Sequence, residues 1–260
     1  NHDHAAHGGN FYAKGQQEIL RRTREAHEWG DRKPVITGEG MSETHINLLD
    51  GSISGHTDIN PHSLPVFQTI HSDRLSAIGL RINLEDMLDM DRFMAKMGLT
   101  LVRGKQLGWF ETKLVSDTYD LTLPELRPTV EKLKECSAVR RAGQEFLFFG
   151  EMVRPPNSET GSSEIPWSNH IPYHKAGKTR MENVPFVYAA AYRSPAGNIG
   201  IVMVNRTASE QRISIPWNEK DWGLKTGQTA GQSIFINGKW SAEKKNGIPK
   251  TLEFTIPPYT

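Results

Sequence analysis

A single carboxylate in a glycine-rich turn is the first residue here with the character of a catalytic group. Residues 35–40 read Val-Ile-Thr-Gly-Glu-Gly, so Glu39 follows a short β-branched run that is typical of a buried parallel strand. The flanking glycines let the backbone approach a ligand closely. A carboxylate at the end of such a strand can act as general acid or base. A helix N-cap and a loop salt bridge are the structural alternatives.

Histidines cluster at the amino-terminal end of the sequence, where residues 1–10 read Asn-His-Asp-His-Ala-Ala-His-Gly-Gly-Asn. Three imidazoles beside an aspartate could ligate zinc, but this spacing is not a common zinc signature. Neutral imidazole both donates and accepts hydrogen bonds, which suits a hydroxyl-rich ligand. We therefore expect His2, Asp3, His4 and His7 to bind substrate and no metal. A metal site in this loop and solvated histidines are the alternatives.

Polar side chains that follow apolar runs form a second group of candidates for substrate binding: Asp50, His56, Gln68 and Trp109. Asp50 follows two leucines, and Gln68 follows Val66 and Phe67. An indole beside polar groups suits stacking on the apolar face of a sugar ring. For Asp50 an Asp–Gly turn is the alternative, and for Trp109 it is ordinary packing.

The composition excludes several classes of protein. The 31 Lys and Arg residues nearly cancel the 30 Asp and Glu residues, which argues against a dedicated nucleic-acid binder. No apolar run approaches the roughly 18 residues of a membrane span. The single cysteine, Cys136, excludes a disulfide framework and a multi-cysteine metal site. A serine nucleophile elbow, a dinucleotide fingerprint and a Walker motif are missing, so nothing in the sequence supports a serine hydrolase, a dehydrogenase or an NTPase. No cofactor is expected.

The elements that must position these residues change character near residue 155. Helices are predicted at 15–29, 84–98 and 124–149, with short strands at 35–37 and 99–102. Alternation of helices and strands favours an α/β fold with a parallel sheet over residues 1–154. Residues 155–183 are rich in Pro, Ser, Asn and Gly, and are predicted to be a linker or long loop.

Residues 184–260 carry the signals of an antiparallel β-sandwich. Strands are predicted at 186–192, 199–205, 211–215, 234–236 and 252–256. Asn237-Gly238 between apolar runs is typical of a type I′ hairpin. Several short strands with turns between them indicate a small sandwich. Its predicted buried residues are Phe186, Ile201, Val204, Ile215, Phe235 and Phe254.

Segments 8–12, 35–40, 49–51 and 65–68 together resemble a group of bacterial (β/α)8 glycoside hydrolases. Many members of this group are large secreted proteins, and they are distantly similar to endo-α-N-acetylgalactosaminidases. The resemblance implies the second half of a (β/α)8 (TIM-type) barrel followed by a C-terminal antiparallel β-sandwich. It also implies a secreted or periplasmic location.

The activity implied by the resemblance is retaining hydrolysis of a poly- or oligosaccharide by two carboxylates. Glu39 matches the acid/base position, although Gly38 stands where related proteins tend to carry threonine. The nucleophile of such proteins lies on an earlier strand, so we expect it upstream of Asn1, in the remainder of the same polypeptide. Asp3 then binds substrate. The alternatives are a non-catalytic carbohydrate-binding protein and a metal-dependent hydrolase or lyase that uses the histidine-rich loop.

Overall fold

The computed structural model describes residues 11–39, 43–53, 60–108, 110, 121–168, 179–217, 219–224, 231–236, 238–244 and 250–260. The helices are α1 (Phe11–Glu25), α2 (Val66–His71), α3 (Leu84–Leu88), α4 (Met90–Val102), α5 (Arg127–Ala142) and α6 (Gln144–Leu147), with 3-10 turns η2 (His27–Trp29), η3 (Glu43–Leu48) and η4 (Pro124–Leu126). The first strands are β1 (Thr37–Glu39), β2 (Gly51–Ile53), β3 (Ser76–Ala77), β4 (Glu151–Val153), β5 (Ser162–Ser168) and β6 (Thr179–Pro185). The later strands are β7 (Val187–Arg193), β8 (Ile199–Asn205), β9 (Gln211–Pro216), β10 (Gly231–Ile236), β11 (Lys239–Lys244) and β12 (Thr251–Ile256).

The amino-terminal part contains a parallel sheet. Strands β1, β2 and β3 lie side by side in that order, and both neighbouring pairs are parallel. Parallel bridges Ile78–Gln106 and Ile82–Phe110 extend the sheet beyond β3. Among the described residues these strands form an open sheet and not a closed barrel. The structure thus has a mixed α/β fold, in which a parallel sheet is followed by small antiparallel sheets.

The first strand differs from its prediction in position and in burial. It was expected at residues 35–37 as a buried strand, but β1 begins at Thr37 and ends at Glu39. Val35 is 80% exposed. The reason is that β1 pairs with β2 alone in the described sheet, and a β-branched run predicts burial only where neighbours cover it.

Helix α4 is buried along almost its whole length, from Arg92 to Val102. It begins at Met90 and is capped by Asp89, whose side chain accepts hydrogen bonds from the backbone amides of Asp91 and Arg92. The strand predicted at 99–102 is wrong, because these residues form the last turn of α4. A short apolar run cannot distinguish a buried strand from a helix that is covered on all sides.

Strands β7 and β8 separate two apolar clusters. Tyr188 and Tyr192 on β7 belong to the cluster that contains α4, whereas Val187 and Ala191 on the opposite face pack against β9 and β12. This alternation follows from the two-residue period of a strand. The sheet β4–β7–β8 therefore has helices on one face and the β9–β12 pair on the other.

The strands predicted in the carboxyl-terminal part are confirmed as antiparallel hairpins and pairs. The β7–β8 loop contains residues 194–198, and the β10–β11 register places Ile236 opposite Lys239. Asn237 of the predicted type I′ turn lies outside the described residues. Of the predicted core residues, Val204 and Ile215 are buried. The others are partly buried: Phe186, Ile201, Phe235 and Phe254.

The segment 155–183, expected to be a linker or long loop, contains β5 and the beginning of β6. Ile165 and Trp167 of β5 lie in the same apolar cluster as α4. The polar and proline-rich composition concealed this strand because its buried residues are few and widely spaced. The proposed boundaries at 154 and 184 remain a prediction, but one core contains residues from both sides of them.

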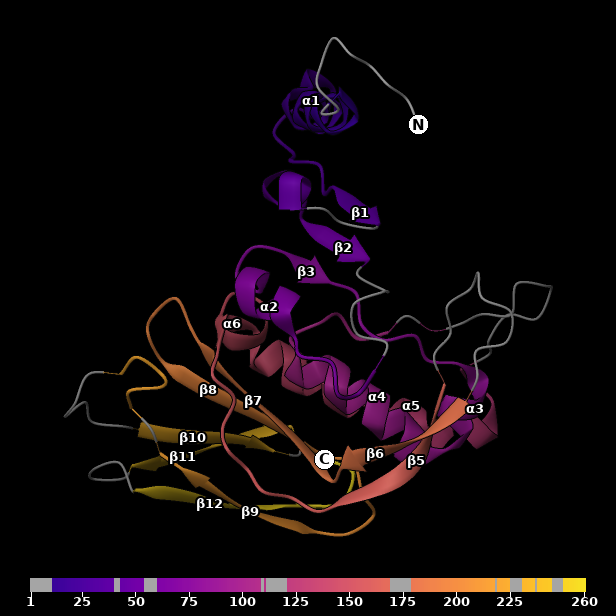
Figure 1. Ribbon diagram of the computed structural model, residues 1–260, viewed down its shortest axis with the longest axis vertical. Coiled ribbons are helices and arrows are strands. Elements are labelled where there is room, and N and C mark those ends of the chain that lie inside the picture. Colours follow the sequence, from indigo (N-terminus) through magenta and orange to yellow (C-terminus); the bar gives the residue numbers. More distant parts are fainter. Residues whose placement is uncertain are drawn as a thin grey trace.

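Figure 1 shows how these parts are arranged along the long axis of the molecule. Helix α1 and the parallel strands occupy one end, and the strands β7–β12 occupy the other. Helices α4 and α5 lie between them. The antiparallel strands β7 and β8 thus pack on α4 of the preceding part.

We predict that Gly98→Ala destabilises the protein by about 1–3 kcal/mol, because it overpacks the contact between α4 and β8. A Cβ at Gly98 would lie 2.8 Å from Cγ1 of Val204 and 3.3 Å from Tyr188. Gly15 in α1 is the matched control, since a Cβ there meets nothing within 4 Å. Gly15→Ala should raise stability by up to about 1 kcal/mol. Urea unfolding of both variants measures this, and equal effects would contradict the close packing.

Candidate functional site

Glu39 is the last residue of β1 and lies opposite Ile53, the last residue of β2. Its side chain is exposed, and it forms no hydrogen bond or ion pair with the part of the chain that the structure describes. Gly38 beside it packs closely on Leu49, since a Cβ there would come within 3.2 Å of Cδ1 of that side chain. Glu39 therefore stands at the carboxyl edge of the parallel sheet, where a ligand could reach its carboxylate.

Asp50 lies at the other end of the strands, directly before β2. Its Oδ2 accepts hydrogen bonds from Nη2 of Arg24 at 2.9 Å and from the backbone amide of Ile36 at 2.8 Å. The backbone amide of Asp50 in turn donates to the carbonyl of Ile36. These bonds fasten α1 and the start of β1 to β2. The structure gives Asp50 this positioning role and does not bring it to the edge that carries Glu39.

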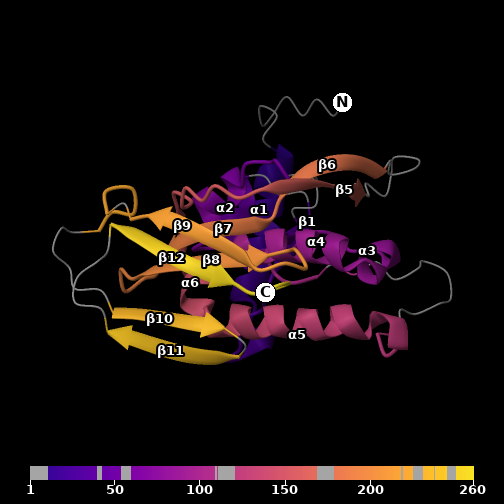
Figure 2. The same ribbon diagram turned by 90° about the horizontal axis from the view of Figure 1, so that it is seen from below.

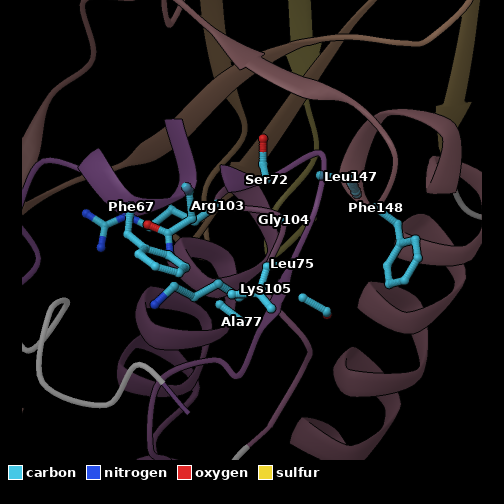
Figure 3. Close-up of a pocket in the computed structure, with 11 residues that line it drawn as sticks. Phe67, Ser72, Leu75, Ala77, Arg103, Gly104, Lys105, Leu147 and Phe148 are labelled. Carbon is cyan, nitrogen blue, oxygen red and sulfur yellow. The ribbon is translucent and has the colours of Figure 1, made fainter. Parts of the chain in front are cut away.

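Gln68 lines a small cavity between α2, β3 and the turn after α4 (Figure 3). Gln68 is 3% exposed, and neither polar atom of its side-chain amide has a hydrogen-bond partner among the described residues. Ser76 Oγ, on the same cavity, is also buried without a partner. The cavity admits about one water molecule, so it is too small for a sugar ring. In this conformation Gln68 does not face a surface that a saccharide could reach.

The remaining candidates from the sequence lie outside the described residues: His2, Asp3, His4, His7, His56 and Trp109. Within the described ranges, no group of three His, Cys, Asp or Glu side chains is close enough to hold a metal ion. Among the same residues, no helix is long and apolar enough to cross a membrane. The metal alternative depends on the histidine-rich loop and so remains a prediction.

A buried charged group that the sequence did not predict joins α3, α4 and β5. Asp86 is completely buried, and its carboxylate contacts Nζ of Lys96 at 2.5 Å and Nη2 of Arg92 at 3.0 Å. Lys96 Nζ also donates to Ser168 Oγ at 2.9 Å. The capping pattern Asn83-x-x-Asp86 and a lysine inside an apolar helix were the available signals.

This charged group is structural and not a nucleophilic pair. A serine activated by lysine requires an amine that is free to take the proton of the hydroxyl. Here the Lys96 ammonium is one half of a buried ion pair with Asp86, and both are closed off from solvent. Cys136 is equally unsuited as a nucleophile, because burial raises the pKa of its thiol to about 12.

Comparison with known proteins gives two matches. Residues 1–82 match a domain of unknown function, DUF6259. A Monosiga brevicollis protein named "Putative glycoside hydrolase 22789" is 26% identical over 182 residues, which cover 63% of this chain and 15% of that protein. The chain therefore spans only a small part of the length of this relative. The distant similarity agrees with the resemblance to glycoside hydrolases that the sequence motifs indicated.

We predict that Gln68→Met leaves the stability unchanged or raises it by up to about 1–3 kcal/mol, because it removes a buried amide that has no partner. Ser72→Ala is the contrasting variant. Ser72 Oγ donates to the Gly150 carbonyl at 3.1 Å and accepts from the Met152 amide at 3.0 Å, so its loss should cost about 0.5–1.5 kcal/mol. Thermal unfolding checks both. If Gln68→Met lowered the stability more than Ser72→Ala does, the side-chain amide of Gln68 would have an essential hydrogen-bond partner, which would contradict this account.

Proposed function

We propose that this chain is part of a glycoside hydrolase in which Glu39 donates a proton to the leaving oxygen. The observation that carries the proposal is the place of Glu39, at the carboxyl end of a strand in a parallel sheet. Catalytic groups of (β/α)8 enzymes lie at this end of the strands. The name of the Monosiga brevicollis relative supports the class of reaction.

The chemistry of an acetal explains the need for this carboxyl group. The glycosidic oxygen is a poor leaving group unless it receives a proton as its bond to carbon breaks. The cationic transition state also needs an anion beside it, which is the task of a second carboxylate. On this proposal Glu39 supplies the first group.

The open edge of β1 supports the further proposal that earlier β/α units complete a barrel. In the described sheet β1 pairs on one side only, and Val35 and Ile19 are both exposed, Ile19 at 65%. Unpaired edges of parallel sheets are normally covered, because their backbone groups need partners. Burying each of these apolar side chains would contribute about 1.5–3 kcal/mol.

The second carboxylate, on this proposal, belongs to an upstream strand of the same polypeptide. Retention of configuration requires it at about 5–5.5 Å from Glu39, and inversion at roughly 6.5–9.5 Å. We propose retention. The substrate would contact side chains from the loops around this edge, for which the sequence offers His2, Asp3, His4, His7, His56 and Trp109.

We predict that Glu39→Gln in the full-length protein lowers kcat for an unactivated glycoside by about 10²–10⁴. The amide keeps the size of the side chain but cannot supply the proton, so KM should change little. Glu28→Gln is the matched control, because Glu28 is also exposed and lies in η2, away from this edge.

Full activity of Glu39→Gln on that substrate would refute the assignment. A wild-type protein that binds glycans but releases no product would instead favour the non-catalytic alternative. Hydrolysis that disappears with chelators and returns with zinc would favour the metal-dependent alternative.

A further inference from the structure

The hairpin β10–β11 carries an aromatic pair that belongs to neither apolar cluster of the protein. Its register places Phe235 directly opposite Trp240, so both side chains lie on the same face of the hairpin. Their ring centroids are 5.2 Å apart and the planes are inclined by 58°. Figure 2 shows the hairpin beside α5, with β11 on its outer side.

Trp240 differs from the other tryptophans that the structure describes. It is 55% exposed, and its indole N–H has no acceptor in the described part of the chain. The others are anchored: Trp167 and Trp222 are buried, Trp217 packs against Trp222, and Trp29 donates from Nε1 to the Thr23 carbonyl. Trp240 alone among them combines an open ring face with a free donor.

We propose that Trp240, supported by Phe235, is a carbohydrate-binding site separate from the edge that carries Glu39. The ligand is a pyranose unit of a poly- or oligosaccharide, whose C–H face would stack on the indole ring. The proposal deepens the proposed function, because the choice of a saccharide as ligand rests on it. Such a site would hold a polymeric substrate near the enzyme without taking part in the reaction.

The size of the exposed apolar surface fits a sugar better than a protein partner. A stable protein interface buries about 800 Å² on each side, whereas an aromatic side chain offers 150–250 Å² at most. Phe235 is already partly covered, so one ring face is the main apolar surface. Ser233, two residues before Phe235 and therefore on the same face of the hairpin, is exposed, which places a hydroxyl group beside the pair.

The hairpin also holds the ring in a fixed orientation. Its strands are joined through a two-residue turn, and Gly238 has a φ of +75°, a left-handed conformation that glycine adopts without strain. Contact with Phe235 restricts rotation of the Trp240 side chain. A preoriented ring loses little conformational freedom on binding, which favours a stacking ligand.

The test is affinity electrophoresis of the full-length protein in gels that contain soluble starch, xylan, galactomannan or mucin O-glycans. All variants carry Glu39→Gln, so that the glycan is not consumed. We expect at least one glycan to retard the protein, and Trp240→Ala to weaken that binding about tenfold or more. Trp240→Tyr should restore most of the binding. Met181→Ala, which removes an equally exposed apolar side chain from β6, should change nothing.

Each other outcome overturns the proposal. The proposal fails if none of the four glycans retards the protein, or if Trp240→Ala binds the glycan as tightly as its parent does. It also fails if substitution of Trp240 changes the oligomeric state and leaves glycan binding unchanged. Circular dichroism excludes unfolding of the variants. Hydrolysis is measured separately, on the protein with Glu39 intact: Trp240-dependent binding together with no hydrolysis by that wild-type protein would sustain this site and refute the proposed function. Hydrolysis by the wild-type protein without Trp240-dependent binding would support the proposed function and refute this site.

Discussion

The fold depends on one helix that is covered on all sides. The buried residues of α4 contact the parallel-sheet part, α5 and the β7–β8 hairpin, so this helix joins the two halves of the chain in one core. Close packing of this kind requires a small residue where backbones meet, and Gly98 provides it against Val204. The same burial forces Lys96 and Arg92 to share the carboxylate of Asp86, since an unpaired charge there would be strongly destabilising.

The two ends of the molecule differ in how completely their sheets are covered. The antiparallel end is a closed structure with cores on both faces of β7 and β8. The parallel end has an open edge at β1, with Glu39 at its carboxyl end and exposed apolar residues nearby. A rigid base that carries an open sheet is suited to complete a catalytic site together with other strands.

The sequence predicted best those elements that depend on local signals. The alternating strands and the helix α5 were found because periodicity acts within a few residues, although the single helix predicted at 124–149 is divided into η4, α5 and α6. The run 99–102 and the strand β5 were missed because their conformation is decided by tertiary packing. The sequence placed Glu39 near the carboxyl end of a parallel strand, although the strand is Thr37–Glu39 and not 35–37. The hydrogen bond of Asp50 with Arg24 and the burial of Gln68 depend on partners distant in sequence.

The dependence of hydrolysis on the leaving group tests the role of Glu39 most directly. Aryl and alkyl glycosides with leaving groups of graded acidity would be compared in the wild-type protein and in Glu39→Ala. If Glu39 donates the proton, the variant should keep nearly the wild-type kcat/KM for a dinitrophenyl glycoside and lose about 10²–10⁴ in kcat/KM on an alkyl glycoside. The quantity compared is kcat/KM, which reports the first step, because in a retaining enzyme the same residue also serves as base in the second step. A loss of the same size across the whole series would contradict this role, because a group that does not deliver the proton has no reason to discriminate between leaving groups.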